Sequence, residues 1–128
     1  MRTNDCAPRA RDGRLAKARQ FAEAASAVLT LTDEADEVAD AFVTLAVHAG
    51  IAAADVICCA RLGVHANGER HDDAVALLKR ADPAAAKALR VLLGMKTSAG
   101  YSAMPVSTTD RRRAERAMDA LLATANAV

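Results

Sequence analysis

Two arginines and two histidines lie between residues 61 and 71, and side chains of these types are suited to binding phosphate. They are Arg61, His65, Arg70 and His71. A guanidinium group binds phosphate oxygens through paired hydrogen bonds, and an imidazole can donate or accept a proton near neutral pH. The cluster predicts either a site that holds or acts on a phosphate, or an exposed polar loop whose cations cap the preceding helix.

A second polar pair, His48 and Asp55, interrupts an otherwise apolar stretch. The two residues are seven positions apart and share one helical face, which Thr44 extends. Two helical turns separate them by roughly 10 Å, too far for a direct hydrogen bond. Because a buried carboxylate needs donors or a cation, we expect either contacts with a neighbouring helix or a polar groove that lines a site.

A run of arginines near the C-terminus forms a candidate basic patch. Its members are Arg111, Arg112, Arg113 and Arg116. Cations at the start of a helix oppose its dipole, so these residues do not serve helix stability. They are candidates for phosphate contacts, or form a solvated face whose partners are the nearby acidic residues. No aromatic residue is interleaved with them, so base stacking on a single strand is not supported.

The cysteine pattern favours reduced thiols in a cytoplasmic protein. The chain has three cysteines, and two of them, Cys58 and Cys59, are adjacent. An odd number with an adjacent pair is a poor disulfide framework. A zinc site built from these two and the histidines is disfavoured, because neighbouring helical side chains point about 100° apart. We expect no metal and no cofactor, and nothing marks a catalytic residue.

Composition and stop signals predict an all-α fold, a compact bundle of about five helices. The 128 residues include 33 alanines but only 3 aromatic residues, and alanine is the best helix former. Gly63, Asp82-Pro83 and Ser107 are typical of helix boundaries. The expected helices span residues 9–31, 33–62, 69–80, 83–96 and 107 onwards. Residues 1–8 are expected to be a flexible tail, and residues 9–128 one domain.

The second helix is expected to be the centre of the bundle. Apolar side chains cover most of its circumference over residues 41–60, which is typical of a helix covered on several sides. Gly50 indicates close packing by a neighbouring helix, from the same chain or from a second subunit. The uncharged run 41–54 is too short to span a membrane, so no membrane partner is expected.

Charge is balanced overall but unevenly distributed. The net charge of +1 gives no global attraction to nucleic acid or membrane. Residues 33–60 hold six acidic and no basic side chains, whereas residues 61–100 hold seven basic and four acidic ones. Most of the acidic block lies where a helix N-terminus favours carboxylates.

The segment from residue 53 to 123 carries motifs that resemble the HEPN superfamily of small helical proteins. The motifs are Ala53-Ala54-Asp55-Val56-Ile57 on a long second helix, Gly68-Glu69-Arg70-His71, Ala74 with Leu77-Leu78, Met95 to Tyr101, Val106-Ser107, and Ala114 with Ala117. Members of that superfamily commonly show a Gly-rich turn ending in His, an Arg-x-x-Ala-Asp-Tyr segment and a last helix that opens with Val-Ser. The resemblance implies an all-α bundle that is often a homodimer.

The resemblance also implies two kinds of function. Many relatives are RNA-cleaving toxins or partners of nucleotidyltransferase-type proteins, and others bind nucleotides or are noncatalytic modules. The ribonucleases carry an Arg-x4-6-His pattern, whereas three residues separate Arg61 from His65 and nine separate it from His71. Lys96 replaces the expected Arg and Gly100 the expected Asp, while His71 and Tyr101 match. These departures weigh against catalysis.

We therefore expect a noncatalytic, dimeric HEPN-like module that binds a nucleotide, RNA or another phosphate-bearing ligand. The expected groove includes His48, Asp55, Arg61, His71, Lys96 and Tyr101, with His65 and Arg70 nearby. One alternative is a divergent ribonuclease that uses His65 or His71 with Arg61. The other is a purely structural or regulatory helical protein.

Overall fold

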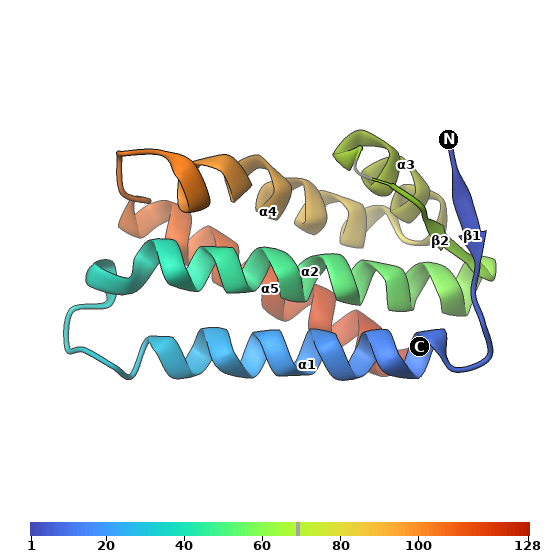
Figure 1. Ribbon diagram of the computed structural model, residues 1–128, viewed down its shortest axis with the longest axis horizontal. Helices are drawn as coiled ribbons and strands as arrows, with labels where there is room; N and C mark the ends of the chain where they lie inside the picture. The colour runs from blue at the N-terminus through green and yellow to red at the C-terminus, as the bar shows by residue number, and fades with distance from the viewer. Residues whose placement is uncertain (69) are drawn as a thin grey trace.

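The long apolar helix in the middle of the chain is the centre of the fold. The computed structural model describes residues 1–68 and 70–128. Helix α2 (Ala39–Leu62) runs between α1 (Ala10–Val28) and α4 (Pro83–Tyr101), and α5 (Thr108–Ala127) crosses behind it (Figure 1). The short α3 (His71–Ala81) completes the five α-helices of the described residues. The fold is therefore an all-α bundle with a long second helix, as the sequence predicts.

Helix α2 is buried because its neighbours cover it on several sides. Phe42, Val43 and Ile57 are fully buried along its length. The stretch Ala35–Leu62 is long and apolar enough to cross a membrane by length and composition, but most of its apolar window is buried inside the bundle. A core helix of a bundle shows the same composition.

Small residues on α2 allow α4 and α5 to approach closely. A Cβ atom added to Gly50 would lie 2.4 Å from Leu92 Cδ1 of α4 and 3.2 Å from Leu121 Cδ1 of α5. The neighbour expected at Gly50 is therefore supplied by the same chain. Packing of this kind keeps the helices at small separations and fills the bundle centre with side chains.

The three boundary signals act as predicted. Gly63 ends α2 with a φ of 74°, in the left-handed region that favours glycine. The Asp82 carboxylate accepts a hydrogen bond from the Ala85 amide at 2.9 Å and caps α4. The Ser107 hydroxyl accepts one from the Asp110 amide at 3.1 Å and caps α5.

Other boundaries differ from the predictions. A short 3-10 helix, η1 (Ala35–Val38), precedes α2, because the Thr32 hydroxyl accepts from the Glu34 amide and donates to Glu37 in a local turn. Helix α4 continues past Lys96 to Tyr101, since Gly100 is exposed and does not break it. Glu69, the expected start of the third helix, lies outside the described residues.

The N-terminal residues form a strand where we expected a loose tail. Strand β1 (Thr3–Asp5) pairs antiparallel with β2 (Val64–Ala66), in a segment that we predicted to be a loop. The two strands lie at the end of the bundle where α1 begins and α2 ends (Figure 1). This two-stranded ribbon thus joins two segments that are far apart in the sequence.

A disulfide bond connects Cys6 to Cys59, so the interpretation of these two cysteines as reduced thiols was wrong. Their Cα atoms are 5.7 Å apart across a sequence separation of 53 residues. Neighbouring helical positions point about 100° apart, so Cys59 meets the strand end while Cys58 remains a free, buried thiol. The number of cysteines did not show that the two adjacent residues face different surroundings, Cys59 towards Cys6 and Cys58 towards the core.

Candidate functional site

The structure separates the predicted site residues into several places. His71 and Lys96 come together, with 3.4 Å between Lys96 Nζ and His71 Nε2. His48 and Asp55 lie on the side of α2 that meets α1. Tyr101 is 84% exposed at the end of α4. The single groove expected from the sequence is therefore not assembled as one surface.

Arg61 holds two helix ends together. Its Nη1 atom donates to Asp82 Oδ2 at 2.8 Å and to the Ala81 carbonyl at 3.1 Å. The hydrogen bond from the Ala85 amide, followed by the Arg61 guanidinium, lowers the pKa of Asp82. Arg61 therefore fastens the end of α2 to the start of α4.

His48 and Asp55 contact helix α1 rather than each other. The His48 ring lies 5.4 Å from the Phe21 ring, centroid to centroid, with planes inclined at 30°. Asp55 forms an ion pair with Arg14 at 3.3 Å. Burial raises the pKa of Asp55, and the charges of Arg14 and His65 oppose that rise only in part. These contacts match the expectation that the two residues meet a neighbouring helix.

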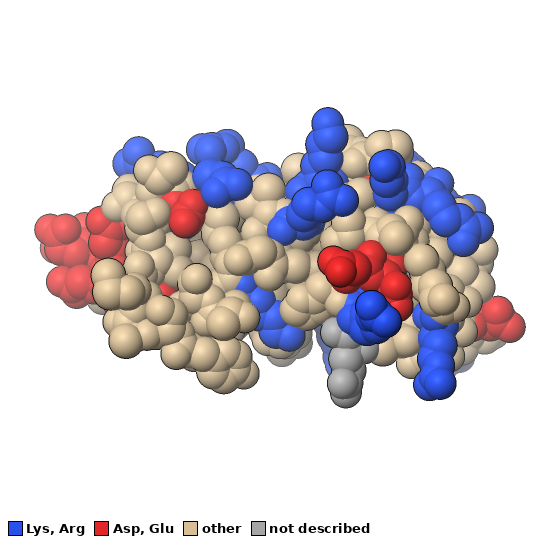
Figure 2. Space-filling view, turned by 90° about the horizontal axis from the view of Figure 1, so that it is seen from above, with Lys and Arg blue, Asp and Glu red and all other residues tan. Residues whose placement is uncertain are grey.

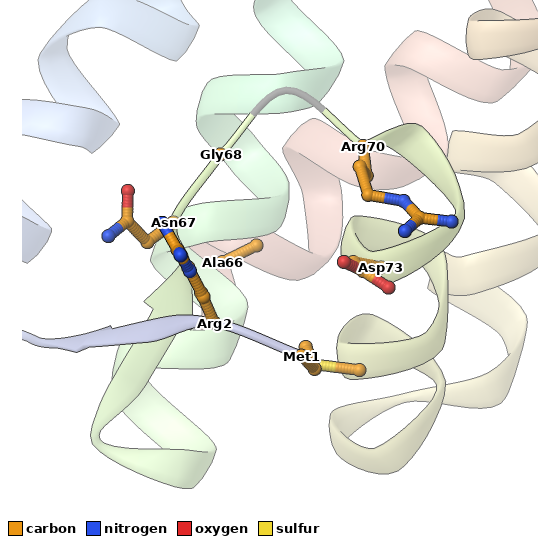
Figure 3. A pocket seen from close by; sticks show the side chains of 7 residues that line it. All are labelled: Met1, Arg2, Ala66, Asn67, Gly68, Arg70 and Asp73. Carbon is orange, nitrogen blue, oxygen red and sulfur yellow. The ribbon is translucent and has the colours of Figure 1, made fainter.

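A hollow of about 510 Å³ lies where the β1–β2 ribbon meets the start of α3. Met1 and Arg2 directly precede β1, and Arg70 and Asp73 lie at the start of α3 (Figure 3). The Arg2 side chain rises beside Asn67, whereas Arg70 lies over the start of α3 above Asp73 (Figure 3). The two guanidinium groups therefore do not converge on one point.

His65 is the middle residue of β2 and pairs with Asn4 of β1. Its Nδ1 atom is 3.0 Å from the carbonyl oxygen of Ala66. Because that ring nitrogen faces a carbonyl acceptor, it carries the proton. His65 is thus held by its own strand and is separate from the His71–Lys96 pair.

The arginines of the predicted basic patch are divided among three surroundings. Arg111 is buried, with Glu115 Oε2 at 3.4 Å and Asp36 Oδ1 at 4.0 Å, and its Nε atom has no hydrogen-bond partner among the described residues. Arg112 is exposed on the side that faces Leu29. Only Arg113 and Arg116 face α4. Arg111 is therefore a packing residue, because it continues the buried stripe of Ala114 and Met118.

Three adjoining hollows over α3, α4 and α5 form a basic surface, which we name the α3–α5 groove. Two of them share Lys87, Val91 and Arg113, and two share Arg90 and Gly94. Its basic side chains are Lys79, Lys87, Arg90, Arg113 and Arg116, with His71 at one end. Lys and Arg side chains gather over this face in Figure 2, which views the molecule from the α3 and α4 side.

Most of the positive charge in the α3–α5 groove has no acidic partner. Its lining holds two acidic residues, Asp72 and Asp110, and Asp110 pairs with Arg113 at 3.0 Å. Within residues 1–68 and 70–128, no carboxylate lies within ion-pair distance of Lys79, Lys87, Arg90 or Arg116. Like charges held together without partners favour binding of an anion.

Gly94 joins the hollows on the two sides of α4. It is exposed, lines hollows on both sides, and has no atom within 4 Å of the position where a Cβ would stand. A larger residue here would stand as a ridge between the hollows. The missing side chain therefore makes the surface continuous.

Sequence reasoning did not single out Lys79, Lys87, Arg90 or Gly94. A signal existed, because Lys87 and Arg90 are three positions apart and so share a helical face, as do Arg113 and Arg116. The pairing of the two faces depends on how α4 packs against α5. Periodicity within one helix does not show that packing.

The cysteine and metal chemistry of the described residues is limited. Burial, followed by the charge of Asp55, raises the pKa of Cys58 to about 12, which leaves it an unreactive thiol. No group of three or more His, Cys, Asp or Glu side chains among the described residues is placed to hold a metal ion. Cys59 is bonded to Cys6 and is not free to ligate zinc.

Comparison of the chain with protein-family models, with curated proteins and with solved structures finds no match to any of the three. Inferences about function therefore rest on the α3–α5 groove and its charge.

Proposed function

We propose that the protein is a noncatalytic HEPN-like helical module that binds the phosphate backbone of RNA along the α3–α5 groove. One observation carries the proposal: five Lys and Arg side chains line a continuous surface with only two acidic residues. The chain as a whole has a net charge of +1. The groove therefore carries a local excess of positive charge that the net charge of the chain does not reveal.

The shape of the groove favours a strand of phosphates over a single nucleotide. Its hollows extend from α3 across α4 to α5, so several phosphates in a row would meet successive cations. Its lining contains no Phe, Tyr or Trp side chain on which a base could stack. Contacts to phosphates alone position a nucleic acid without reading its sequence, so we expect little sequence preference.

Fluorescence anisotropy with a labelled RNA hairpin and a matching single strand tests this proposal. We expect binding at low ionic strength that weakens between about 50 and 200 mM salt, because bound cations displace counterions from the phosphates. A K87Q/R90Q double variant should bind more weakly and should reduce the log–log salt slope by about two. A mononucleotide competitor should not displace the RNA.

The matched control is an R11Q/K17Q double variant on α1. It removes the same charge from two exposed positions outside the α3–α5 groove and should leave RNA affinity unchanged. Equal weakening in both variants would mean that net charge alone drives binding. A wild-type protein that binds no RNA at low salt would refute the proposal.

A Gly94→Gln substitution tests the continuity of the groove without changing its charge. The added side chain meets no atom within 4 Å at its Cβ, and replacing glycine within a helix favours folding. We expect weaker RNA binding by a normally folded protein. Unchanged affinity would show that the hollows on the two sides of α4 bind independently or not at all.

RNA cleavage is a second candidate function, supported by the His71–Lys96 pair. His71 lines one end of the α3–α5 groove, and the Lys96 ammonium is 3.4 Å from its ring. An imidazole there could move a proton while the cation stabilises charge on a phosphate. Arg61 is held by Asp82 and is not placed for that role. Cleavage of bound RNA that is lost in His71→Ala would support a ribonuclease.

The HEPN resemblance adds a homodimer, and a nucleotidyltransferase-type protein as a partner, to the proposal. Light scattering tests the dimer, since a dimer has twice the 13.4 kDa chain mass. A Gly50→Leu variant cannot serve as the dimerisation test, because Gly50 packs against α4 and α5 of its own chain. A stable dimer that binds no RNA would favour the structural or regulatory alternative.

A further inference from the structure

The N-terminal strand is attached to the bundle by backbone hydrogen bonds, one exposed side-chain hydrogen bond from Asn67 Nδ2 to Asn4 Oδ1 at 3.1 Å, and one covalent bond. All three residues of β1 are exposed. Beyond the pairing with β2, the Cys6 amide donates to the Gly63 carbonyl and the Asn67 amide donates to the Arg2 carbonyl, each at 3.0 Å. No residue of β1 belongs to the hydrophobic core.

Such a ribbon is too weak to persist by itself. A two-stranded hairpin is at best marginally stable in water, and these strands pair over only three residues each. The helices do not depend on the strand, because α1 begins at Ala10 and packs on α2 through Ala18 and Ala25. The Cys6–Cys59 bond therefore decides whether the strand stays in place.

We propose that the Cys6–Cys59 disulfide is a redox-sensitive clasp, whose reduction by a dithiol releases residues 1–6 from β2 while the helical bundle stays folded. Release also dismantles the hollow beside the β1–β2 ribbon, since Met1 and Arg2 form one of its walls (Figure 3). The oxidised protein therefore has this hollow and the reduced protein does not.

The reduction proceeds by two thiol–disulfide exchanges. A thiolate of the dithiol attacks Cys6 Sγ, which belongs to the half-buried partner, and the Cys59 sulfur leaves and takes up a proton. The first step leaves a mixed disulfide between Cys6 and the first sulfur of the reagent. The second thiol of the reagent, as its thiolate, then attacks that first reagent sulfur, and the Cys6 sulfur leaves and takes up a proton. Two electrons pass from the dithiol, which becomes a disulfide.

The remaining cysteine does not compete for the clasp. Cys58 is 3% exposed and points into the core, whereas Cys59 faces Cys6. The oxidised chain thus has one pairing available, and oxidation after reduction restores the same bond. A reversible clasp requires this specificity.

Hydrogen–deuterium exchange of the full chain tests the clasp. In the air-oxidised protein, the amides that donate across the ribbon, those of Asn4, Cys6, His65 and Asn67, should be protected. Dithiothreitol should bring their exchange close to that of an open chain, as expected for local opening. The amides of α2 and α4 should exchange faster only to the extent that loss of the bond lowers global stability, and should stay far slower than those of the ribbon. Alkylation followed by mass measurement should find no reactive thiol before reduction and two afterwards.

Two variants distinguish a local clasp from a bond on which the whole bundle depends. Cys6→Ser should show the fast exchange without any reductant, whereas Cys58→Ala should keep the clasp and respond to dithiothreitol like the wild type. A ribbon that stays protected after reduction would overturn the proposal. So would loss of protection in α2 and α4 at the same time, because the bond would then hold the whole fold.

Discussion

Replacing Gly50 by alanine should destabilise the bundle, although alanine is normally the better helix former. The new Cβ would lie 2.4 Å from Leu92 Cδ1 and 3.2 Å from Leu121 Cδ1. Both leucines are fully buried, so neither can turn into solvent. The substitution therefore adds a methyl group where the core has no space for it.

Two opposing terms set the size of the effect. Alanine gains about 1 kcal/mol over glycine in a helix interior. Inserting a carbon into a well-packed core costs about 1–3 kcal/mol. We expect the free energy of unfolding to fall by roughly 1 kcal/mol, which lowers the melting temperature by roughly 3–5 °C in a domain of this size.

Thermal and urea unfolding followed by circular dichroism measure this change, with Gly13→Ala as the control. Gly13 lies inside α1 and has no atom within 4 Å of its Cβ position, so alanine there should stabilise the protein by up to about 1 kcal/mol. Adding Leu92→Ala to both the wild type and Gly50→Ala should remove the penalty of the Gly50 change. Equal stabilisation by the Gly50 and Gly13 substitutions would refute the packing described for α2.

Three further predictions concern charge and the covalent link. Asp82→Ala should lower the free energy of unfolding by about 1 kcal/mol at pH 7, because the cap of α4 is lost. The folded pKa of Asp82 is lowered from 3.8, so the stability difference between this variant and the wild type should shrink as pH falls below 3.8 in urea titrations. Burial raises the folded pKa of Asp55 above 3.8, so ionisation of this carboxyl opposes folding. The stability of Asp55→Asn relative to wild type, measured by urea unfolding, should therefore rise as pH increases from about 4 to 7. A difference that does not change with pH would contradict the burial of this carboxylate. Cys6→Ser should lower the free energy of unfolding by about 2–4 kcal/mol, because the bond closes a long loop in the unfolded chain, while helical circular dichroism at 25 °C should be unchanged.

The order and type of the helices could be predicted because the signals are local. Gly63, the Asp82-Pro83 pair and Ser107 each act within one helical turn, and alanine enrichment favours helix wherever it occurs. The predicted end of α4 at residue 96 was too early. Gly100 breaks a helix less strongly than proline does, and α4 continues through Gly100 to Tyr101.

The candidate site could be predicted only in part, because it is made by helices packed side by side. Periodicity places Arg113 and Arg116 on one face of α5 and Lys87 and Arg90 on one face of α4, but does not bring the faces together. Arg61 was expected near a ligand and instead holds Asp82. Its partner is distant in sequence and becomes visible only in the fold.

The amino-acid order alone is enough to establish the all-α class, the central position of residues 41–60 and the caps that divide the helices, since propensity and apolar periodicity act over a few residues. Packing in three dimensions establishes the Cys6–Cys59 bond, the burial of Arg111 and the continuity of the α3–α5 groove. Each of these depends on the distance between segments remote in the chain. For the α3–α5 groove, that distance depends on how closely α4 and α5 pack on α2 at Gly50, where a Cβ atom would meet Leu92 and Leu121.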